Sequence, residues 1–161
     1  MHRTRIPTVL AVIAVACTSA DATPERGADV AVTGADLPTV LVYKTPTCGC
    51  CNGWVEHMRA AGFTVDARDV SDIMSVKLDA GIPGAMSSCH TAIVDGYVVE
   101  GHVPAEQIER LLAERPDIAG IAVPGMPTGS PGMEGRDPQP YQVFSIGRDG
   151  SAAVFAEVDP R

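Results

Sequence analysis

Three cysteines fall within four residues, in the run Cys48-Gly49-Cys50-Cys51. The run follows a short β-branched apolar stretch and precedes a stretch with helical periodicity, so we expect it at the N-terminus of a helix. Free backbone amides and the helix dipole favour thiolate over thiol there. Cys48 and Cys51 alone form the C-x-x-C pair of a disulfide oxidoreductase. The third thiol, Cys50, adds a compact set of soft ligands suited to Cu(I) or Zn²⁺.

Further sulfur and nitrogen ligands occur downstream. Cys89 and His90 directly precede an expected strand, where they can face the first three thiols. His102 follows the next strand, and its alternative role is a structural one at that corner. Met126 and Met133 lie in two Pro-Gly-Met turns, and thioethers are ligands that suit Cu(I). The alternative for both methionines is to cover an apolar edge of the fold.

Hydrophobic periodicity and turn residues divide the chain into strands and helices. Asp72 is an N-cap signal for a helix that points Ile73, Val76 and Leu78 inward. Asp95-Gly96 is typical of a two-residue hairpin turn. The expected strands are 39–44, 63–70, 91–94, 97–100, 142–146 and 152–157, and the expected helices are 51–61, one between Asp72 and Gly81, and one between Pro104 and Pro116. Residues 121–135 are expected to form a Pro/Gly loop.

This order predicts an α/β, thioredoxin-like fold (β-α-β-α-β-β-α) that is extended by the C-terminal loop and an extra β-hairpin. In thioredoxin-like proteins a cis-proline occupies the position before the third strand, opposite the C-x-x-C pair. In this sequence His90 occupies that position. The exchange of an inert proline for a Cys-His pair indicates metal binding more than the docking of a peptide substrate.

Four stretches of the sequence resemble a family of exported copper-resistance proteins, the CopG-like family, formerly a domain of unknown function. They are KTPTCGCC (44–51), SCHTA (88–92), VEGHVP (99–104) and AVPGMP (122–127). The resemblance spans about residues 39–158. It implies a thioredoxin-like fold, copper bound through the C-x-C-C cysteines and the later cysteine, and a role in copper detoxification or copper redox handling.

We therefore predict that thiolates bridge more than one Cu(I) ion. The predicted metal ligands are Cys48, Cys50, Cys51, Cys89, His90, His102, Met126 and Met133. Three alternatives stay open. The first is a thiol-disulfide oxidoreductase in which Cys48 attacks and Cys51 resolves. The second is a closed zinc site. The third is a structural role with two disulfides, for example Cys48–Cys51 and Cys50–Cys89.

The N-terminus predicts export. Arg3 and Arg5 precede an apolar run that is too short to span a bilayer, so we expect a signal peptide over residues 1–16. The residues before Cys17 resemble a bacterial lipobox, which would make Cys17 the anchor of a lipoprotein. The alternative is a cleaved signal and a soluble protein. In both cases we expect the periplasm, and contact with a membrane only through the lipid.

Composition limits the remaining functions. Residues 17–38 lack periodicity and are expected to form a disordered linker before a metal-binding domain over 39–158. The chain has 161 residues and 45 % hydrophobic residues, enough for one packed domain. Its net charge is −8 and it contains two lysines, so nothing would drive binding to nucleic acid. The expected partners are metal ions and exported copper-handling proteins.

Overall fold

The computed structural model describes residues 37–161, which lie within one compact unit. The predicted signal peptide over 1–16, the lipobox at Cys17 and nearly all of the linker over 17–38 lie outside these residues. Within the described part of the chain, no helix has both the length and the apolar character that crossing a membrane requires.

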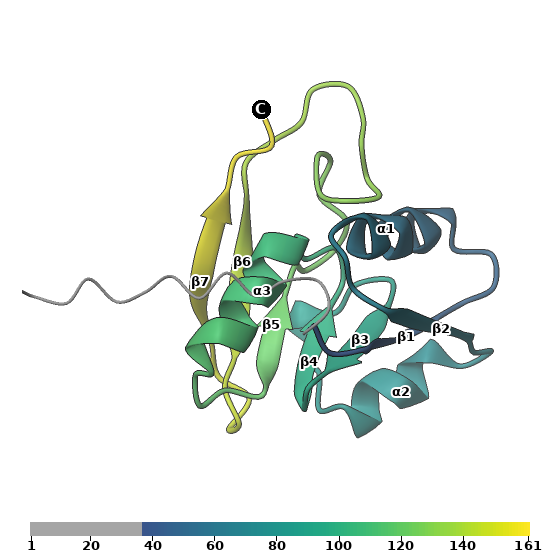
Figure 1. Ribbon diagram of the computed structural model, residues 1–161. Helices are drawn as coiled ribbons and strands as arrows, with labels where there is room; N and C mark the ends of the chain where they lie inside the picture. Colours follow the sequence, from purple (N-terminus) through teal and green to yellow (C-terminus); the bar gives the residue numbers. More distant parts are fainter. Residues whose placement is uncertain (1–36) are drawn as a thin grey trace, which may run out of the picture. The chain divides into compact units, whose positions relative to one another are not determined.

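Seven strands form one sheet in the order β2-β1-β3-β4-β5-β6-β7 (Figure 1). The strands are β1 (Val40–Lys44), β2 (Val65–Asp69), β3 (Thr91–Val94), β4 (Tyr97–Glu100), β5 (Gly120–Ala122), β6 (Tyr141–Ile146) and β7 (Ala152–Val158). The α-helices are α1 (Gly49–Ala60), α2 (Ile73–Asp79) and α3 (Ala105–Glu114), and a short 3₁₀ helix, η1, covers Gly84–Met86.

The first four strands have the predicted arrangement. β1 is parallel to β2, as a helical crossover requires, and antiparallel to β3. β3 and β4 are joined by the Asp95-Gly96 turn, in which both residues have positive φ angles (46° and 84°). The mixed α/β fold and its β-α-β-α-β-β-α order are therefore confirmed, together with the C-terminal hairpin of β6 and β7.

Three local expectations were wrong. The loop expected from residue 121 begins only after Ala122, because 120–122 form β5, which pairs with both β4 and β6 and joins the hairpin to the sheet. Helix α1 begins at Gly49 and not at Cys51, since Cys48 is its N-cap. Leu78 of α2 is 73 % exposed, and the buried residue of that helix is Lys77.

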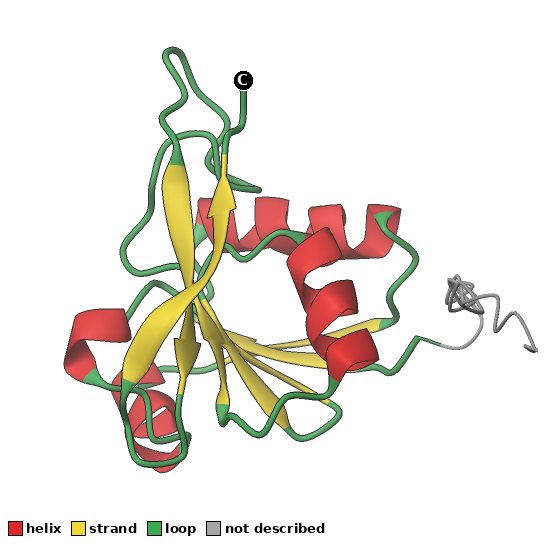
Figure 2. Ribbon diagram, turned by 90° about the vertical axis from the view of Figure 1, so that its left-hand side faces the viewer, coloured by secondary structure: helices red, strands yellow, loops and turns green. Residues whose placement is uncertain are grey.

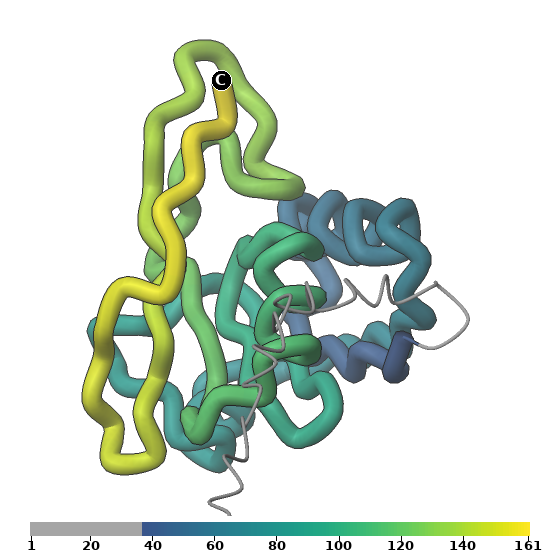
Figure 3. Tube along the Cα trace, turned by 60° about the vertical axis from the view of Figure 1, so that its left-hand side comes forward, coloured from purple at the N-terminus to yellow at the C-terminus, as the bar shows by residue number. Residues whose placement is uncertain are grey.

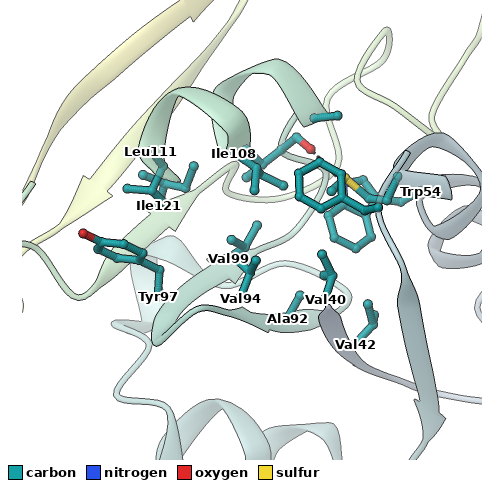
Figure 4. Packing of buried hydrophobic residues seen from close by; sticks show 14 of the residues in the cluster. Val40, Val42, Trp54, Ala92, Val94, Tyr97, Val99, Ile108, Leu111 and Ile121 are labelled. Atoms are coloured by element: carbon teal, nitrogen blue, oxygen red, sulfur yellow. Dashed lines mark hydrogen bonds between the residues drawn. The ribbon is translucent and has the colours of Figure 1, made fainter. Parts of the chain in front are cut away.

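Helices α1 and α3 cover one face of the sheet, and α2 lies on the other (Figure 2). Side chains that alternate along β1 and β4 meet α1 and α3 in the main core (Figure 4). Trp54 of α1 is fully buried there and donates its indole N–H to the carbonyl of Val103 at 2.8 Å. This contact joins the cysteine-bearing helix to the segment between β4 and α3.

Candidate metal centre

The first part of the site is the N-terminal turn of α1, which we call the helix half (Cys48, Cys50 and Cys51). Pro46 ends β1, and the amide of Cys48 donates to the carbonyl of Thr45 at 3.2 Å in the turn that follows. The Cys48 side chain makes no capping hydrogen bond, so the first amides of the helix stay available to stabilise negative charge on sulfur. Cys51 is buried, whereas Cys48 and Cys50 are half-buried.

Cys48 and Cys51 form a disulfide, with their Cα atoms 5.3 Å apart. Cys50 and Cys89 are free thiols. Of the two disulfides in the structural alternative, only Cys48–Cys51 is formed. The Sγ atoms of Cys50 and Cys89 lie 3.9 Å apart, which is contact and not a bond.

All four sulfur atoms lie within 4.8 Å of one another. Cys89 Sγ is 3.5 Å from Cys51 Sγ, and Cys48 Sγ is 3.5 Å from Cys50 Sγ. Separations of this size allow sulfur atoms to share a soft metal ion, because metal–sulfur bonds are about 2.3 Å long. The structure therefore brings together all four cysteines that the sequence singled out.

The second part of the site is the sheet half (Cys89, His90 and His102), which lies at the open end of the β3–β4 hairpin. Cys89 and His90 precede β3 and His102 follows β4. Thr91 pairs with Glu100 in the hairpin, so the residues beyond these two are also brought side by side. Cys89 Sγ and one nitrogen of each imidazole lie within 4.8 Å of one another.

His102 presents an unprotonated nitrogen to Cys89. Its Nδ1 lies 2.8 Å from the carbonyl of Pro131, and a carbonyl only accepts, so Nδ1 carries the proton. In the neutral ring Nε2 then has a free lone pair, and this atom lies 2.9 Å from Cys89 Sγ. An imidazole held by a carbonyl on one side and facing a thiol on the other has the arrangement of a metal-ligating histidine.

His90 has a buried ring nitrogen that no described residue satisfies. The ring is fully buried between Trp54 and His102, and its Nδ1 lies 3.4 Å from Cys89 Sγ. Its Nε2 is buried and has no hydrogen-bond partner within the described residues. A buried polar atom without a partner costs free energy, so this ring fits a role that the polypeptide alone does not satisfy.

Burial keeps the sheet half uncharged. It raises the pKa of the Cys89 thiol to about 12, and the neighbouring Cys50 adds to this effect. It also lowers the pKa of His102, and it lowers the pKa of His90 well below the usual value, with further contributions from His102 and Lys77. At neutral pH both imidazoles are therefore neutral and can act as ligands.

The two methionines lie on a loop that reaches the start of α1 (Figure 3). Met126 is 51 % exposed, and Met133 is half-buried. Met133 directly follows Gly132, where a Cβ atom would lie 2.6 Å from the amide nitrogen of Trp54 and would also meet the carbonyl of Cys50. The loop is thus packed directly on the helix half. Coordination by Met126 or Met133 stays a prediction.

His57, six residues after Cys51, has a structural contact instead. Its Nε2 accepts a hydrogen bond from the amide of Ala105, the first residue of α3, at 3.0 Å. Two further polar residues, Lys77 and Glu100, are buried next to the sheet half, and neither was predicted from the sequence to be near the site. The alternation of side chains along β4 could have revealed that Glu100 is buried. Glu100 shares its face of the strand with Val98, on the side of the sheet that α2 covers.

The fold and the site define a class: an α/β protein whose first helix carries three clustered cysteines at its N-terminus, two of them joined in a disulfide. A family model described as "Protein of unknown function, DUF411" matches residues 86–133. The solved structure named "Copper resistance protein copG- Form 2" has 47 % sequence identity and a TM-score of 0.73, and the match covers 76 % of this chain and 99 % of that one.

The structure named "Copper resistance protein copG- Form 1" is similar at 47 % identity, with a TM-score of 0.71 and coverage of 76 % and 98 %. No curated protein matches the chain. The chain belongs to the CopG-like copper resistance family, as its four sequence stretches predict.

Proposed function

We propose that this protein binds copper outside the cytoplasm, as more than one Cu(I) ion bridged by the thiolates of Cys48, Cys50, Cys51 and Cys89, and so contributes to copper resistance. The relatives named as copper resistance proteins support the choice of metal. Clustered thiolates are ligands that select Cu(I), and one thiolate can bridge two such ions.

The observation that carries the proposal is the meeting of the two halves at Cys89. Its sulfur is the common neighbour of Cys50, Cys51 and His102. The Nδ1 of His90, 3.4 Å from Cys89 Sγ, and the free lone pair of His102 Nε2 add nitrogen donors next to these sulfurs. A purely structural disulfide pair would have no use for two neutral, buried imidazoles at the same place.

The Cys48–Cys51 disulfide sets a condition on binding. Its two sulfurs could serve as thiolate ligands only after reduction by an external dithiol, which gives up two electrons and two protons, becomes a disulfide itself, and leaves Cys48 and Cys51 as two thiols. Binding of Cu(I) then displaces the thiol protons, including that of Cys89, whose pKa of about 12 is raised by burial. We therefore expect copper uptake by the reduced protein to exceed that of the oxidised protein.

The test is an anaerobic Cu(I) titration of the reduced full chain against a chromophoric chelator, with the variants Cys50→Ser and Asn52→Ser. Asn52 is an exposed residue of the same helical turn, so its replacement controls for changes to the helix. We expect tight uptake of more than one equivalent, strongly reduced by Cys50→Ser alone. One weak equivalent, unchanged in Cys50→Ser, would exclude the copper cluster, and tighter binding of Zn²⁺ than of Cu(I) would favour the closed zinc site.

The disulfide itself supports a second candidate function, thiol-disulfide exchange. Cys48 is half-buried and can be attacked or can attack, whereas Cys51 is buried behind it as a resolving thiol. A metal-free insulin-reduction assay with Cys48→Ser as the inactive control tests this function. Efficient turnover by the metal-free protein would favour the oxidoreductase, and turnover no faster than that of Cys48→Ser would rule it out.

We also propose that residues 1–16 direct export to the periplasm, with Cys17 as a lipid anchor, and that exported copper-handling proteins exchange copper with the site. Mass spectrometry of the mature N-terminus in periplasmic and membrane fractions separates the alternatives. Diacylated Cys17 in the membrane fraction would establish a lipoprotein, and an unmodified mature chain in the periplasm would establish a soluble one.

A further inference from the structure

A buried ion pair lies next to the sheet half, on the opposite face of the sheet from α1. Lys77 of α2 and Glu100 of β4 have side chains that are 4 % and 0 % exposed, and Lys77 Nζ lies 2.5 Å from Glu100 Oε1. The Lys77 ammonium also donates to the hydroxyl of Thr91 at 3.1 Å. Burial of such a pair costs desolvation free energy, so pure stability does not explain why it is there.

The Glu100 carboxylate holds the Cys89-His90 dipeptide at both ends. Glu100 Oε1 accepts the backbone N–H of Ser88, the residue before Cys89, at 2.6 Å. Glu100 Oε2 accepts the hydroxyl of Thr91, the residue after His90, at 2.7 Å. One carboxylate therefore fixes the residues on either side of two candidate ligands, although it touches neither of them.

The same strand end also positions His102. Gly101 follows Glu100 with φ 72°, and its amide donates to the carbonyl of His90 at 3.0 Å. A Cβ atom on Gly101 would lie 2.5 Å from the Cβ of Ser88, so the two segments are in direct contact. His102 comes next and reaches Cys89, so the sheet half is built around the residues that Glu100 holds.

We propose that Glu100 is a positioning residue for the metal centre: its carboxylate holds Cys89 and His90 at the helix half, and Lys77 is its counter-charge. This inference rests on the proposed function for its copper readout. The geometry assigns different roles to the two partners. The placement of Cys89 depends on the two hydrogen bonds that the carboxylate accepts, whereas folding stability depends on the balance of charge between Glu100 and Lys77.

Two variants separate these roles. Lys77→Met removes the counter-charge and the hydrogen bond to Thr91 but leaves the two acceptor oxygens of Glu100, so it should lower the melting temperature and weaken Cu(I) binding less than a change at Glu100 does. Lys77→Met combined with Glu100→Gln restores neutrality but replaces one acceptor oxygen by an amide group. It should recover melting temperature and still bind Cu(I) about ten-fold or more weakly, as for other residues that orient ligands.

The experiment measures three quantities on the reduced full chain: melting temperature, Cu(I) affinity with the near-UV sulfur-to-copper absorption, and amide exchange of segment 87–91 without metal. Glu114→Gln, which removes the carboxylate of an exposed ion pair with Arg110, is the control for the amide replacement. The double variant should show weaker binding, altered absorption and faster exchange. Wild-type affinity and absorption in the folded double variant would overturn the proposal.

Failure of the proposed function would look different, because the wild-type chain itself would then take up no more than one weak equivalent of Cu(I). The exchange measurement decides the positioning role in that case. Faster exchange of segment 87–91 in the double variant than in Lys77→Met would support the role of the carboxylate, and equal exchange in the two variants would overturn it.

Discussion

The two halves of the candidate metal centre are built in different ways. The helix half comes from one turn of α1, is partly open to solvent, and contains the disulfide. The sheet half comes from the two ends of a hairpin, is mostly buried, and holds neutral groups. Under the proposed function, the helix half would respond to redox conditions through its disulfide, and the sheet half would supply donors that burial keeps neutral.

The largest expected loss of Cu(I) affinity comes from replacing one thiol of each half in turn. Cys89→Ser should weaken Cu(I) binding on the order of 100-fold or more, because the Cys89 sulfur of the sheet half also contacts Cys50 and Cys51 of the helix half. Cys50→Ser should weaken binding less, since the other thiols of the helix half and Cys89 remain together. Chelator competition on both reduced variants measures this difference, and equal losses would show that the halves contribute alike.

The next comparison is between His102, which faces Cys89, and His57, which contacts the start of α3. His102→Asn should weaken Cu(I) binding about 10–100-fold, because it removes the nitrogen that faces Cys89. His57→Asn removes the acceptor for the first amide of α3 and should cost about 1 kcal/mol of stability with unchanged copper binding. The measurements are copper titration and urea unfolding. A loss of Cu(I) affinity in His57→Asn would show that His57 contributes to the metal site.

Packing of the loop on the helix half can be tested with two glycines of equal φ. Gly132 and Gly150 both have φ 81°, but a Cβ atom would meet Cys50 and Trp54 at Gly132 and open space at Gly150. Gly150→Ala should cost about 1 kcal/mol through backbone strain alone. Gly132→Ala should cost about 2 kcal/mol more through the clash. Urea unfolding measures both, and equal costs would contradict close docking of the loop.

The smallest effect is a pH dependence that arises from the histidines. Burial lowers the pKa of His57, His90 and His102 in the folded protein, so the unfolded chain binds their protons first. Stability is then fully present above about pH 6.5, the usual histidine value, and falls as pH drops toward the lowered values. Urea unfolding of the metal-free protein at pH 7.5 and pH 5.5 should show this loss. Higher stability at pH 5.5 would contradict neutral burial.

Much of the fold follows from local patterns in the sequence. The Asp95-Gly96 turn, the Asp72 cap and the alternating strands predict elements that the structure contains, since each depends on neighbours close in the chain. β5 was missed because its three residues are too few for a period, and only pairing with β4 and β6 makes them a strand. The inward placement of Leu78 was wrong because the core side of α2 is taken by Lys77.

The same distinction applies to the site. A C-x-C-C run places three cysteines together in any fold, so the helix half can be predicted from the sequence. The nearness of Cys89 and His102 is also implied by the hairpin, because extending its register beyond Thr91 and Glu100 brings them opposite one another. The partner of His102 could not be predicted, since the carbonyl of Pro131 belongs to a loop whose path depends on packing against α1.

By itself the sequence determined the chemistry available to this protein: which sulfur and nitrogen donor side chains it carries, which of them are adjacent, and which α/β order surrounds them. Tertiary structure decided how they are used. It brought Cys89 against Cys50 and Cys51 of the helix half, buried His90 with a nitrogen that has no partner among the described residues, and placed a carboxylate behind the segment that carries Cys89 and His90. The reason is physical: residue type sets ligand softness and charge, whereas desolvation and long-range contacts exist only once distant segments pack together.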